Sequence, residues 1–190
     1  MELGLTGKIA LVTGGSKGIG KGIARVLSAE GCRVAICSRT RDDIEATAAE
    51  ITGETGNEVA AFEGAVGHFG GVDILVNNAG AAPGGVIENL TEDDWAESLQ
   101  LKFMGYVRCT KAVLPHMQRR GHGRIVNLIG NDGIKHSYWE IAPGAANAAG
   151  QNFTLSMAGR YGKDGISFVA VNPGPVRTER WDGLVKAMAR

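Results

Sequence analysis

The chain has 190 residues, the length of one domain with a substantial core, so we predict a single domain over residues 1–190. Its 20 basic and 20 acidic side chains cancel, which argues against nucleic acid or an anionic membrane as a partner. No apolar stretch approaches membrane-spanning length, and three irregularly spaced cysteines and four scattered histidines offer no disulfide framework or metal site. We therefore expect a cytoplasmic protein without a metal.

Short apolar strands alternate with helical patterns along the whole chain. Several strands are continuous apolar runs, as expected when both faces of a sheet are covered. Thr91 and Asp94 resemble a capping box before the third helix. The alternation predicts an α/β fold, a Rossmann-like doubly wound parallel sheet with helices on both faces. In chain order we expect a strand at Ile9–Thr13, a helix at Ile19–Glu30, a strand at Arg33–Ser38, a helix at Asp42–Ile51, strands at Glu58–Phe62 and Ile74–Asn77, a helix at Asp93–Met117, a strand at Arg124–Ile129, a helix at Ala145–Tyr161 and a strand at Ile166–Val171.

One connection is too short for this fold. Only nine residues, Glu63 to Gly71, join the third and fourth strands. In a 3-2-1-4 strand order this connection must cross three strand spacings, about 14 Å, and return along the strand direction by about 15 Å. Nine fully extended residues reach roughly 30 Å, so the chain can barely make this connection. No crossover helix fits, so we expect the fold to be incomplete after the third strand. A genuine deletion and a segment missing from the sequence both explain this, and the helix-tail character of residues 65–71 favours the second.

The most informative stretch is Thr13-Gly14-Gly15-Ser16-Lys17-Gly18-Ile19-Gly20, between the first strand and the first helix. A strand, a glycine-rich turn and a helix N-terminus form a cradle for phosphate, because free N–H groups and the helix dipole both favour an anion there. Gly14 permits the tight turn, Gly18 lets a diphosphate approach the backbone, and Gly20 lets the helix pack on the strand. Glycine turns also occur for purely conformational reasons, which is the alternative interpretation.

Four later motifs accompany this turn. They are Asn77-Asn78-Ala79-Gly80, Gly123-Arg124-Ile125-Val126-Asn127, Asn152-Phe153-Thr154 with Ser156-Met157-Ala158, and Asn172-Pro173-Gly174-Pro175-Val176 with Thr178. In this order and spacing, over nearly the whole chain, they resemble a classical short-chain dehydrogenase/reductase. The resemblance implies a Rossmann-like fold, NAD(P)(H) and a small-molecule substrate. Members usually continue to a further helix and a seventh strand, so the C-terminus also looks short. The cofactor-binding residues expected in this chain are Gly14, Ser16, Lys17, Gly18, Ile19, Gly20, Ser38, Arg39, Asn78, Ala79, Gly80, Pro173, Gly174, Val176 and Thr178.

The residues at the end of the second strand bear on which dinucleotide is bound. An acidic side chain there would hydrogen-bond the ribose of NAD and repel a 2′-phosphate. This chain has Ser38 and Arg39 instead, with Lys17 inside the glycine turn. Two cations and a hydroxyl favour the phosphate of NADP(H) through charge-assisted hydrogen bonds. The alternative is that both cations are ordinary solvated surface charges.

The resemblance also implies four catalytic positions: a tyrosine, a lysine four residues later, a serine and an asparagine. Alignment without a gap through Asn152-Phe153-Thr154 places Pro143 at the tyrosine position, Asn147 at the lysine position and Gly130 at the serine position. Counting on from Trp95 places Lys102 at the asparagine position. Proline cannot transfer a proton and asparagine carries no charge, so we expect the usual set to be replaced. Losing a positioned acid or base costs roughly 10²–10⁴ in rate.

Other groups near these positions offer a replacement set. Tyr138 lies in the loop after the fifth strand, and Lys102 would supply the cation, so these two are the candidate catalytic residues. His136, Asn131 or Asp132 would bind substrate. The alternative is that Tyr138 packs in its loop and Lys102 is a solvated helix charge. Proline at 143 also suits the first turn of a helix.

Two functions follow. The first is an NADP(H)-dependent oxidoreductase on a carbonyl or alcohol group, of the 3-oxoacyl- or ketone-reductase type, with non-standard catalytic residues if active. The second is a catalytically silent nucleotide-binding protein, such as a sensor or a partner subunit. The small residues at Gly144–Gly150 allow close helix contact, which in this family often builds a dimer interface, so we expect a homodimer or homotetramer. Tight packing within the monomer is the alternative.

Overall fold

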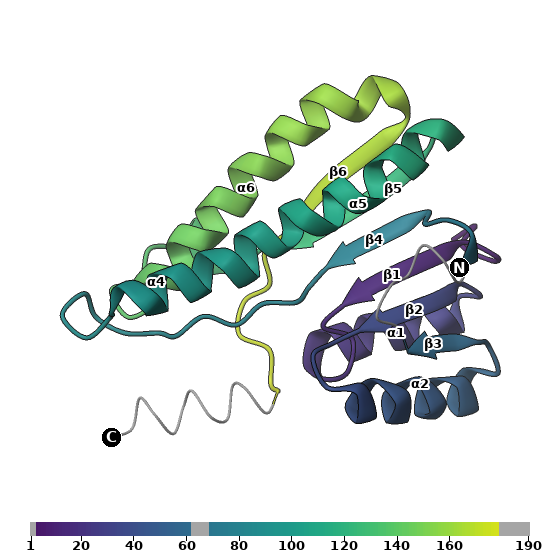
Figure 1. Cartoon of the computed structure of the whole chain (residues 1–190), viewed down its shortest axis with the longest axis horizontal. Helices are drawn as coiled ribbons and strands as arrows, with labels where there is room; N and C mark the ends of the chain where they lie inside the picture. Colours follow the sequence, from purple (N-terminus) through teal and green to yellow (C-terminus); the bar gives the residue numbers. More distant parts are fainter. Residues whose placement is uncertain (1–2, 62–68, 179–190) are drawn as a thin grey trace.

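A computed structural model describes residues 3–61 and 69–178 and contains one parallel sheet of six strands in the order β3-β2-β1-β4-β5-β6 (Figure 1). This arrangement confirms the predicted Rossmann-like α/β fold. The strands are β1 Ile9–Thr13, β2 Arg33–Cys37, β3 Val59–Ala61, β4 Ile74–Asn77, β5 Gly123–Leu128 and β6 Ile166–Val171. The helices are α1 Gly18–Ala29, α2 Arg41–Thr55, α4 Glu92–Ser98, α5 Met104–Arg120 and α6 Ile141–Tyr161, with a π-helical segment at Leu99–Phe103 and 3₁₀ turns at Asn131–Gly133 and Gly162–Asp164.

Helices cover both faces of the sheet, and each face has its own core. Val12 and Ile36 belong to a buried cluster with residues of α1 and α2, whereas Leu75 and Ile125 belong to a cluster with residues of α5 and α6. Figure 1 shows α1 and α2 beside β1 to β3, and α5 and α6 along β4 to β6. Burying one such side chain contributes about 1.5–3 kcal/mol. The continuous apolar runs in the strands therefore reflect a sheet buried on both sides.

The third predicted helix is interrupted. Instead of one helix over Asp93–Met117, α4 is followed by the π-helical segment and then by α5. The predicted capping box is confirmed, since the Asp94 N–H donates to Thr91 Oγ1 at 3.2 Å and the Thr91 N–H donates to Asp94 Oδ2 at 2.9 Å. Such π segments often lie at functional sites, and this one contains Lys102.

Other element boundaries shift by one to four residues. α2 continues past Ile51 and includes Gly53, where no described residue lies within 4 Å of an added Cβ. The helix ends at Gly56, whose φ of +73° favours glycine. α6 begins at Ile141 and has Pro143 in its first turn, as expected for a residue without an N–H. The last residue of the predicted third strand, residues 63–68 of the short crossover and the predicted shortness of the C-terminus lie outside the described residues.

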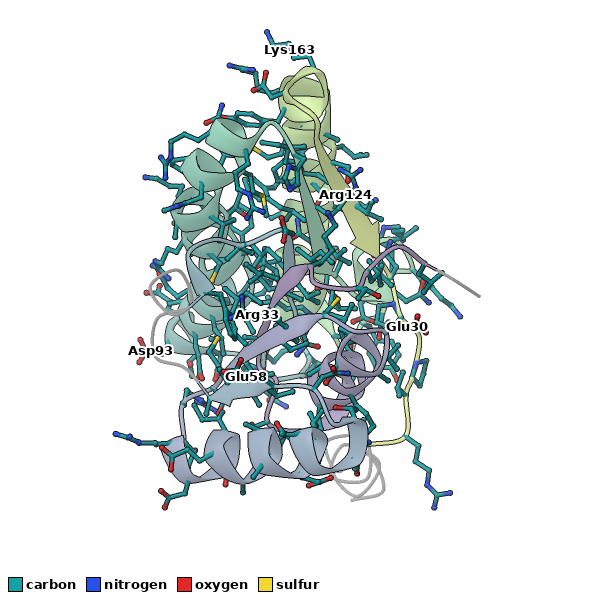
Figure 2. The ribbon with its side chains drawn as sticks, turned by 90° about the vertical axis from the view of Figure 1, so that its right-hand side faces the viewer. Glu30, Arg33, Glu58, Asp93, Arg124 and Lys163 are labelled. Carbon is teal, nitrogen blue, oxygen red and sulfur yellow. The ribbon has the colours of Figure 1, made fainter. Side chains whose placement is uncertain are left out.

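The edge at which the strands begin is anchored by a buried carboxylate. Asp73 is 4% exposed and accepts hydrogen bonds from the Ile9 N–H at 2.8 Å, from His122 Nε2 at 2.8 Å and from Arg120 Nη2 at 2.9 Å. Burial raises the pKa of Asp73, but the Ile9 N–H, His122 and Arg120 outweigh it, so this pKa is lowered overall. Figure 2 faces this edge, with Arg124 of β5 labelled. The glycine turn lies at the opposite edge, where β1 ends and α1 begins.

Two further observations concern membranes and metals. Within residues 3–61 and 69–178, no helix combines the length and apolar character needed to cross a bilayer. The same residues include no group of three or more His, Cys, Asp or Glu side chains placed to hold a metal ion. Burial raises the pKa of the thiols of Cys32, Cys37 and Cys109, which disfavours the thiolate form.

Candidate functional site

The glycine turn leaves the N-terminus of α1 open. The N–H groups of Gly14 and Gly15 donate to the carbonyl of Cys37 at 2.8 and 3.2 Å, which fixes the turn between β1 and β2. α1 starts at Gly18, and no side chain among the described residues caps it at Lys17. Its first turn also contains no acidic residue. Free N–H groups and the positive end of the helix dipole therefore face the carboxyl end of the sheet, where an anion is stabilised.

The glycines of the turn are required by close contacts. A Cβ at Gly20 would collide with the carbonyl of Gly14 and the side-chain amide of Asn78, and one at Gly15 would lie 2.7 Å from Ile36 Cβ. Gly18 has a φ of +57°, which disfavours any other residue. The turn thus forms a backbone cradle of the kind that accommodates a diphosphate, and the residues present fit a dinucleotide.

A second loop is attached to this cradle by Thr13 at the end of β1. Thr13 Oγ1 accepts hydrogen bonds from the N–H groups of Asn78 at 2.9 Å and Ala79 at 3.0 Å. In return, Asn78 Nδ2 donates to the carbonyls of Thr13 at 2.9 Å and Gly14 at 3.1 Å. The predicted cofactor residues Asn78, Ala79 and Gly80 therefore lie directly beside the glycine turn.

The loop after β6 closes the same site from the other side. A Cβ placed on Gly18 would be 3.6 Å from Thr178 Cγ2, so Thr178 faces the start of α1. The loop also contacts the turn after β5, because the Asn131 N–H donates to the carbonyl of Pro173 at 3.2 Å. The segment from Pro173 to Thr178 thus connects the ends of β5 and β6 with the glycine turn.

The end of β2 presents positive charge next to the turn. Ser38 Oγ accepts a hydrogen bond from the Thr40 N–H at 3.4 Å, so the chain bends sharply there. Arg39 is exposed, and so is Lys17 at the start of α1. The carbonyl of Cys37, one residue before Ser38, accepts hydrogen bonds from the N–H groups of Gly14 and Gly15. Arg39 and Lys17 therefore lie close to the cradle.

Three of the four positions expected from the resemblance to be catalytic, Gly130, Pro143 and Asn147, lie in the loop after β5 and in the first half of α6. Asn147 is 1% exposed, and its Nδ2 donates to Asp132 Oδ2 at 3.3 Å. A Cβ at Gly130 would lie 2.7 Å from this Nδ2, so Asn147 occupies the space that a side chain at 130 would need. Pro143 is buried in the first turn of α6. This interlocking of Asn147 with the loop after β5 could not be foreseen from the sequence.

The two candidate catalytic residues lie in different surroundings. A Cβ at Gly80 would be 3.1 Å from Lys102 Cγ, so the aliphatic stem of Lys102 crosses the Asn78–Gly80 loop. Tyr138 is 80% exposed. The buried Tyr106 donates from its hydroxyl to the carbonyl of Leu128 at 2.6 Å, and burial raises the pKa of this phenol. Tyr106 is therefore a structural residue, not a group that exchanges protons at neutral pH.

Two features near the site were missed by sequence reasoning. The loops after β4 and β5 are joined, because the Gly85 N–H donates to the carbonyl of Trp139 at 2.7 Å. Beneath the site, Asn77 Nδ2 donates to Asn127 Oδ1 at 2.8 Å, and Asn127 Nδ2 donates to Thr154 Oγ1 at 2.8 Å. This buried chain of polar groups links β4, β5 and α6. Asn77, Asn127 and Thr154 each stand in one of the family motifs. That shared membership was the one sequence signal that could have indicated this contact.

A parallel sheet of order 3-2-1-4-5-6, with a glycine turn at its first strand–helix junction, defines a Rossmann-type dinucleotide-binding protein. The sequence model of the short chain dehydrogenase family matches residues 8–189, and the chain belongs to this family. Its fold is that of proteins that bind a nicotinamide dinucleotide.

Individual relatives agree with this assignment. The 3-oxoacyl-(acyl-carrier-protein) reductase FabG of Vibrio cholerae is 34% identical over 193 residues, which cover 96% of this chain and 79% of the relative. The L-sorbose reductase of Gluconobacter frateurii, solved with NADPH and L-sorbose, has a TM-score of 0.94 at 28% identity and matches 100% of this chain and 77% of that one. NAD⁺-bound xylitol dehydrogenase has a TM-score of 0.91 at 29% identity, over 97% of this chain and 77% of that one.

Proposed function

We propose that the protein is an NADP(H)-dependent oxidoreductase that acts on a carbonyl or alcohol group of a small molecule, of the 3-oxoacyl- or ketone-reductase type. The observation that carries this proposal is the uncapped N-terminus of α1 behind Gly14 and Gly18, with Thr178 beside it. When bound there, the dinucleotide supplies or accepts a hydride. The names of the Vibrio cholerae and Gluconobacter frateurii relatives support a carbonyl substrate.

The preference for NADP(H) is supported by charge at the end of β2. Arg39 and Lys17 are exposed cations beside the cradle, and Ser38 stands where NAD-binding proteins often have a carboxylate. A guanidinium can hold a 2′-phosphate through charge-assisted hydrogen bonds. The solved relatives include one with NADPH and one with NAD⁺, so this preference rests on the residues of this chain.

Fluorescence titration with NADPH and NADH tests the dinucleotide site. We expect saturable binding of both, tighter for NADPH. Arg39→Ala should weaken NADPH binding about tenfold or more, because a hydrogen bond to a charged group contributes about 1.5–3 kcal/mol, and should leave NADH binding unchanged. Arg160→Ala, an exposed arginine near the end of α6, is the matched control. Absence of saturable binding would contradict the proposal, and tighter NADH binding would contradict the NADP preference.

We infer that the usual catalytic set is replaced, with Gly130, Pro143, Asn147 and Lys102 at its four positions. Tyr138 and Lys102 are the pair that the sequence indicates for proton transfer, and the contact of the Lys102 stem with Gly80 supports a role for this lysine. The exposed ring of Tyr138 must turn toward the site to act.

Turnover distinguishes an enzyme from a silent nucleotide-binding protein. NADPH consumption is followed with 3-oxoacyl thioesters and ketones, in the wild type and in Tyr138→Phe. Unchanged turnover in Tyr138→Phe would exclude this phenol as the proton donor. Saturable NADPH binding without any turnover would instead favour the sensor or partner-subunit alternative.

We also propose a cytoplasmic homodimer or homotetramer. Ala148 and Leu155 are exposed on α6 and lie seven residues apart, on one face of the helix, and Leu155 is 64% exposed. On its other side the helix packs tightly within the monomer, since a Cβ at Gly150 would be 2.9 Å from Ile129 Cδ1. Light scattering should give a mass of two or four chains, and Leu155→Glu should lower it.

A further inference from the structure

The turn after β5 holds a carboxylate to which the proposed function gives no role. Asp132 lies in the 3₁₀ turn Asn131–Gly133, and its side chain is half-buried. Its Oδ2 accepts the hydrogen bond from Asn147 Nδ2 at 3.3 Å. Within residues 3–61 and 69–178, Asn147 is the side chain that engages this carboxylate, so Oδ1 is left for a ligand. Asn147 Oδ1 is itself buried without a hydrogen-bond partner among those residues.

The loop is shaped around this pair. A Cβ at Gly130 would lie 2.7 Å from Asn147 Nδ2, and one at Gly133 would lie 2.8 Å from Asn147 Cβ. A Cβ at Gly144 would lie 3.1 Å from the carbonyl oxygen of Asp132. Three glycines therefore let the turn close onto α6, with Asn147 against Gly130 and Gly133 and with Asp132 against Gly144. The residues that differ from the family pattern at 130 and 147 thus form one packed unit that holds Asp132.

Asp132 lies at the same edge of the sheet as the proposed dinucleotide site. The strands are parallel, so the ends of β1, β4 and β5 meet at this edge. Asn131, the neighbour of Asp132, donates to the carbonyl of Pro173 at 3.2 Å, and the segment from Pro173 reaches Gly18 through Thr178.

The chemistry of a carboxylate fits a site without the family's lysine. A phenol needs a nearby cation before it accepts a proton at neutral pH, whereas a carboxylate is already ionised there. A neutral amide such as that of Asn147 can orient a carboxylate by donating a hydrogen bond to it. The exchange of lysine for asparagine is therefore consistent with an exchange of phenol for carboxylate.

We propose that Asp132 is the proton acceptor for alcohol oxidation at this site and that Asn147 is its positioning residue. The proposal rests on the proposed function, because an oxidised nicotinamide dinucleotide must accept the hydride from the carbinol carbon. The O–H bond of the alcohol breaks, its electron pair forms the carbonyl double bond, and the proton moves to Asp132 Oδ1. The carboxylic acid then returns the proton to water. Asp132 thus takes the role for which the sequence indicates Tyr138.

The test uses the full chain with NADP⁺ and a panel of secondary alcohols. Asp132→Asn and Asp132→Ala should lower kcat by about 10²–10⁴-fold with unchanged NADP⁺ affinity. Asp132→Asn should also keep the wild-type melting temperature, because its amide oxygen can still accept the hydrogen bond from Asn147. Added formate should restore turnover in Asp132→Ala, because a small carboxylate can enter the space that the side chain leaves. Asn147→Ala should lower kcat more than it changes KM. Asp164→Asn, beside Lys163 at the opposite edge of the sheet (Figure 2), is the matched control.

The outcomes separate this proposal from the proposed function. Wild-type protein that binds no dinucleotide would overturn both. Binding without oxidation of any alcohol would overturn the role of Asp132 and favour the silent alternative. Full activity in Asp132→Asn, or loss of activity in Asp132→Ala that formate does not relieve, would overturn the role of Asp132 alone. If Asp132→Asn fails to fold, Asp132→Glu decides: an unaltered pH profile of kcat/KM in that variant overturns the proposal.

Discussion

Gly18 offers the sharpest perturbation of the proposed cradle. Its φ of +57° lies in the left-handed region, where an L-residue costs about 1–2 kcal/mol. Among residues 3–61 and 69–178, a Cβ there would meet Thr178 alone, at 3.6 and 3.9 Å, which is ordinary van der Waals contact. Gly18→Ala should therefore lower the free energy of unfolding by about 1–2 kcal/mol, from backbone strain alone. Urea denaturation measures this loss.

The same methyl group should weaken dinucleotide binding. It would stand where the diphosphate approaches the backbone, and losing one hydrogen bond to a charged group costs about 1.5–3 kcal/mol, roughly 10–150-fold in Kd. Gly22 is the matched control, since it lies in the same helix and no atom of the described part of the chain lies within 4 Å of an added Cβ. Gly22→Ala should keep NADPH affinity and raise stability by up to about 1 kcal/mol.

Fluorescence titration with NADPH compares the two variants. The reasoning predicts weaker binding in Gly18→Ala and wild-type binding in Gly22→Ala. Equal Kd values for the two variants would refute it, because they would show that the start of α1 is not where the diphosphate binds.

Three further predictions concern packing and pH. Asp73→Asn should lower the free energy of unfolding by about 1–3 kcal/mol at neutral pH, as measured by urea denaturation. Because the pKa of Asp73 is lowered in the folded state, this carboxylate stabilises the fold above its unfolded pKa, and the stabilisation disappears as pH falls through the folded pKa. The free energy of unfolding of the variant should therefore fall less steeply in acid than that of the wild type. Thr13→Val removes the hydroxyl that accepts the Asn78 N–H, so the free energy of unfolding should fall by about 1–3 kcal/mol. An unaltered melting curve would contradict this prediction. Gly130→Ser should cost about 1–3 kcal/mol by overpacking against Asn147, and adding Asn147→Ala should relieve part of that cost in thermal melts.

The strands and the glycine turn could be predicted because their signals are local. An apolar run such as Ile74–Asn77 and a glycine-rich turn after a strand each state their structure within a few residues. The position of Thr178 beside Gly18 is different, because these residues are 160 apart in the chain and the resemblance placed them only in the same set of cofactor-binding residues.

Other parts depend on contacts that no local pattern encodes. The apolar periodicity runs through Leu99–Phe103 without a break, so it gave no sign of the π-helical segment. The pairing of Asn147 with Asp132 needs the loop conformation that Gly130 adopts at a φ of +121°. The sequence named Asp132 only as one of several groups for binding substrate, since spacing does not show which side chains meet.

The most direct test of the account is a crystal structure of the protein with NADPH. The proposed site places the diphosphate at the N-terminus of α1, within hydrogen-bond distance of main-chain N–H groups between Gly14 and Gly20, and the 2′-phosphate beside Arg39. A dinucleotide bound elsewhere, or a cradle filled by the protein's own side chains, would contradict it.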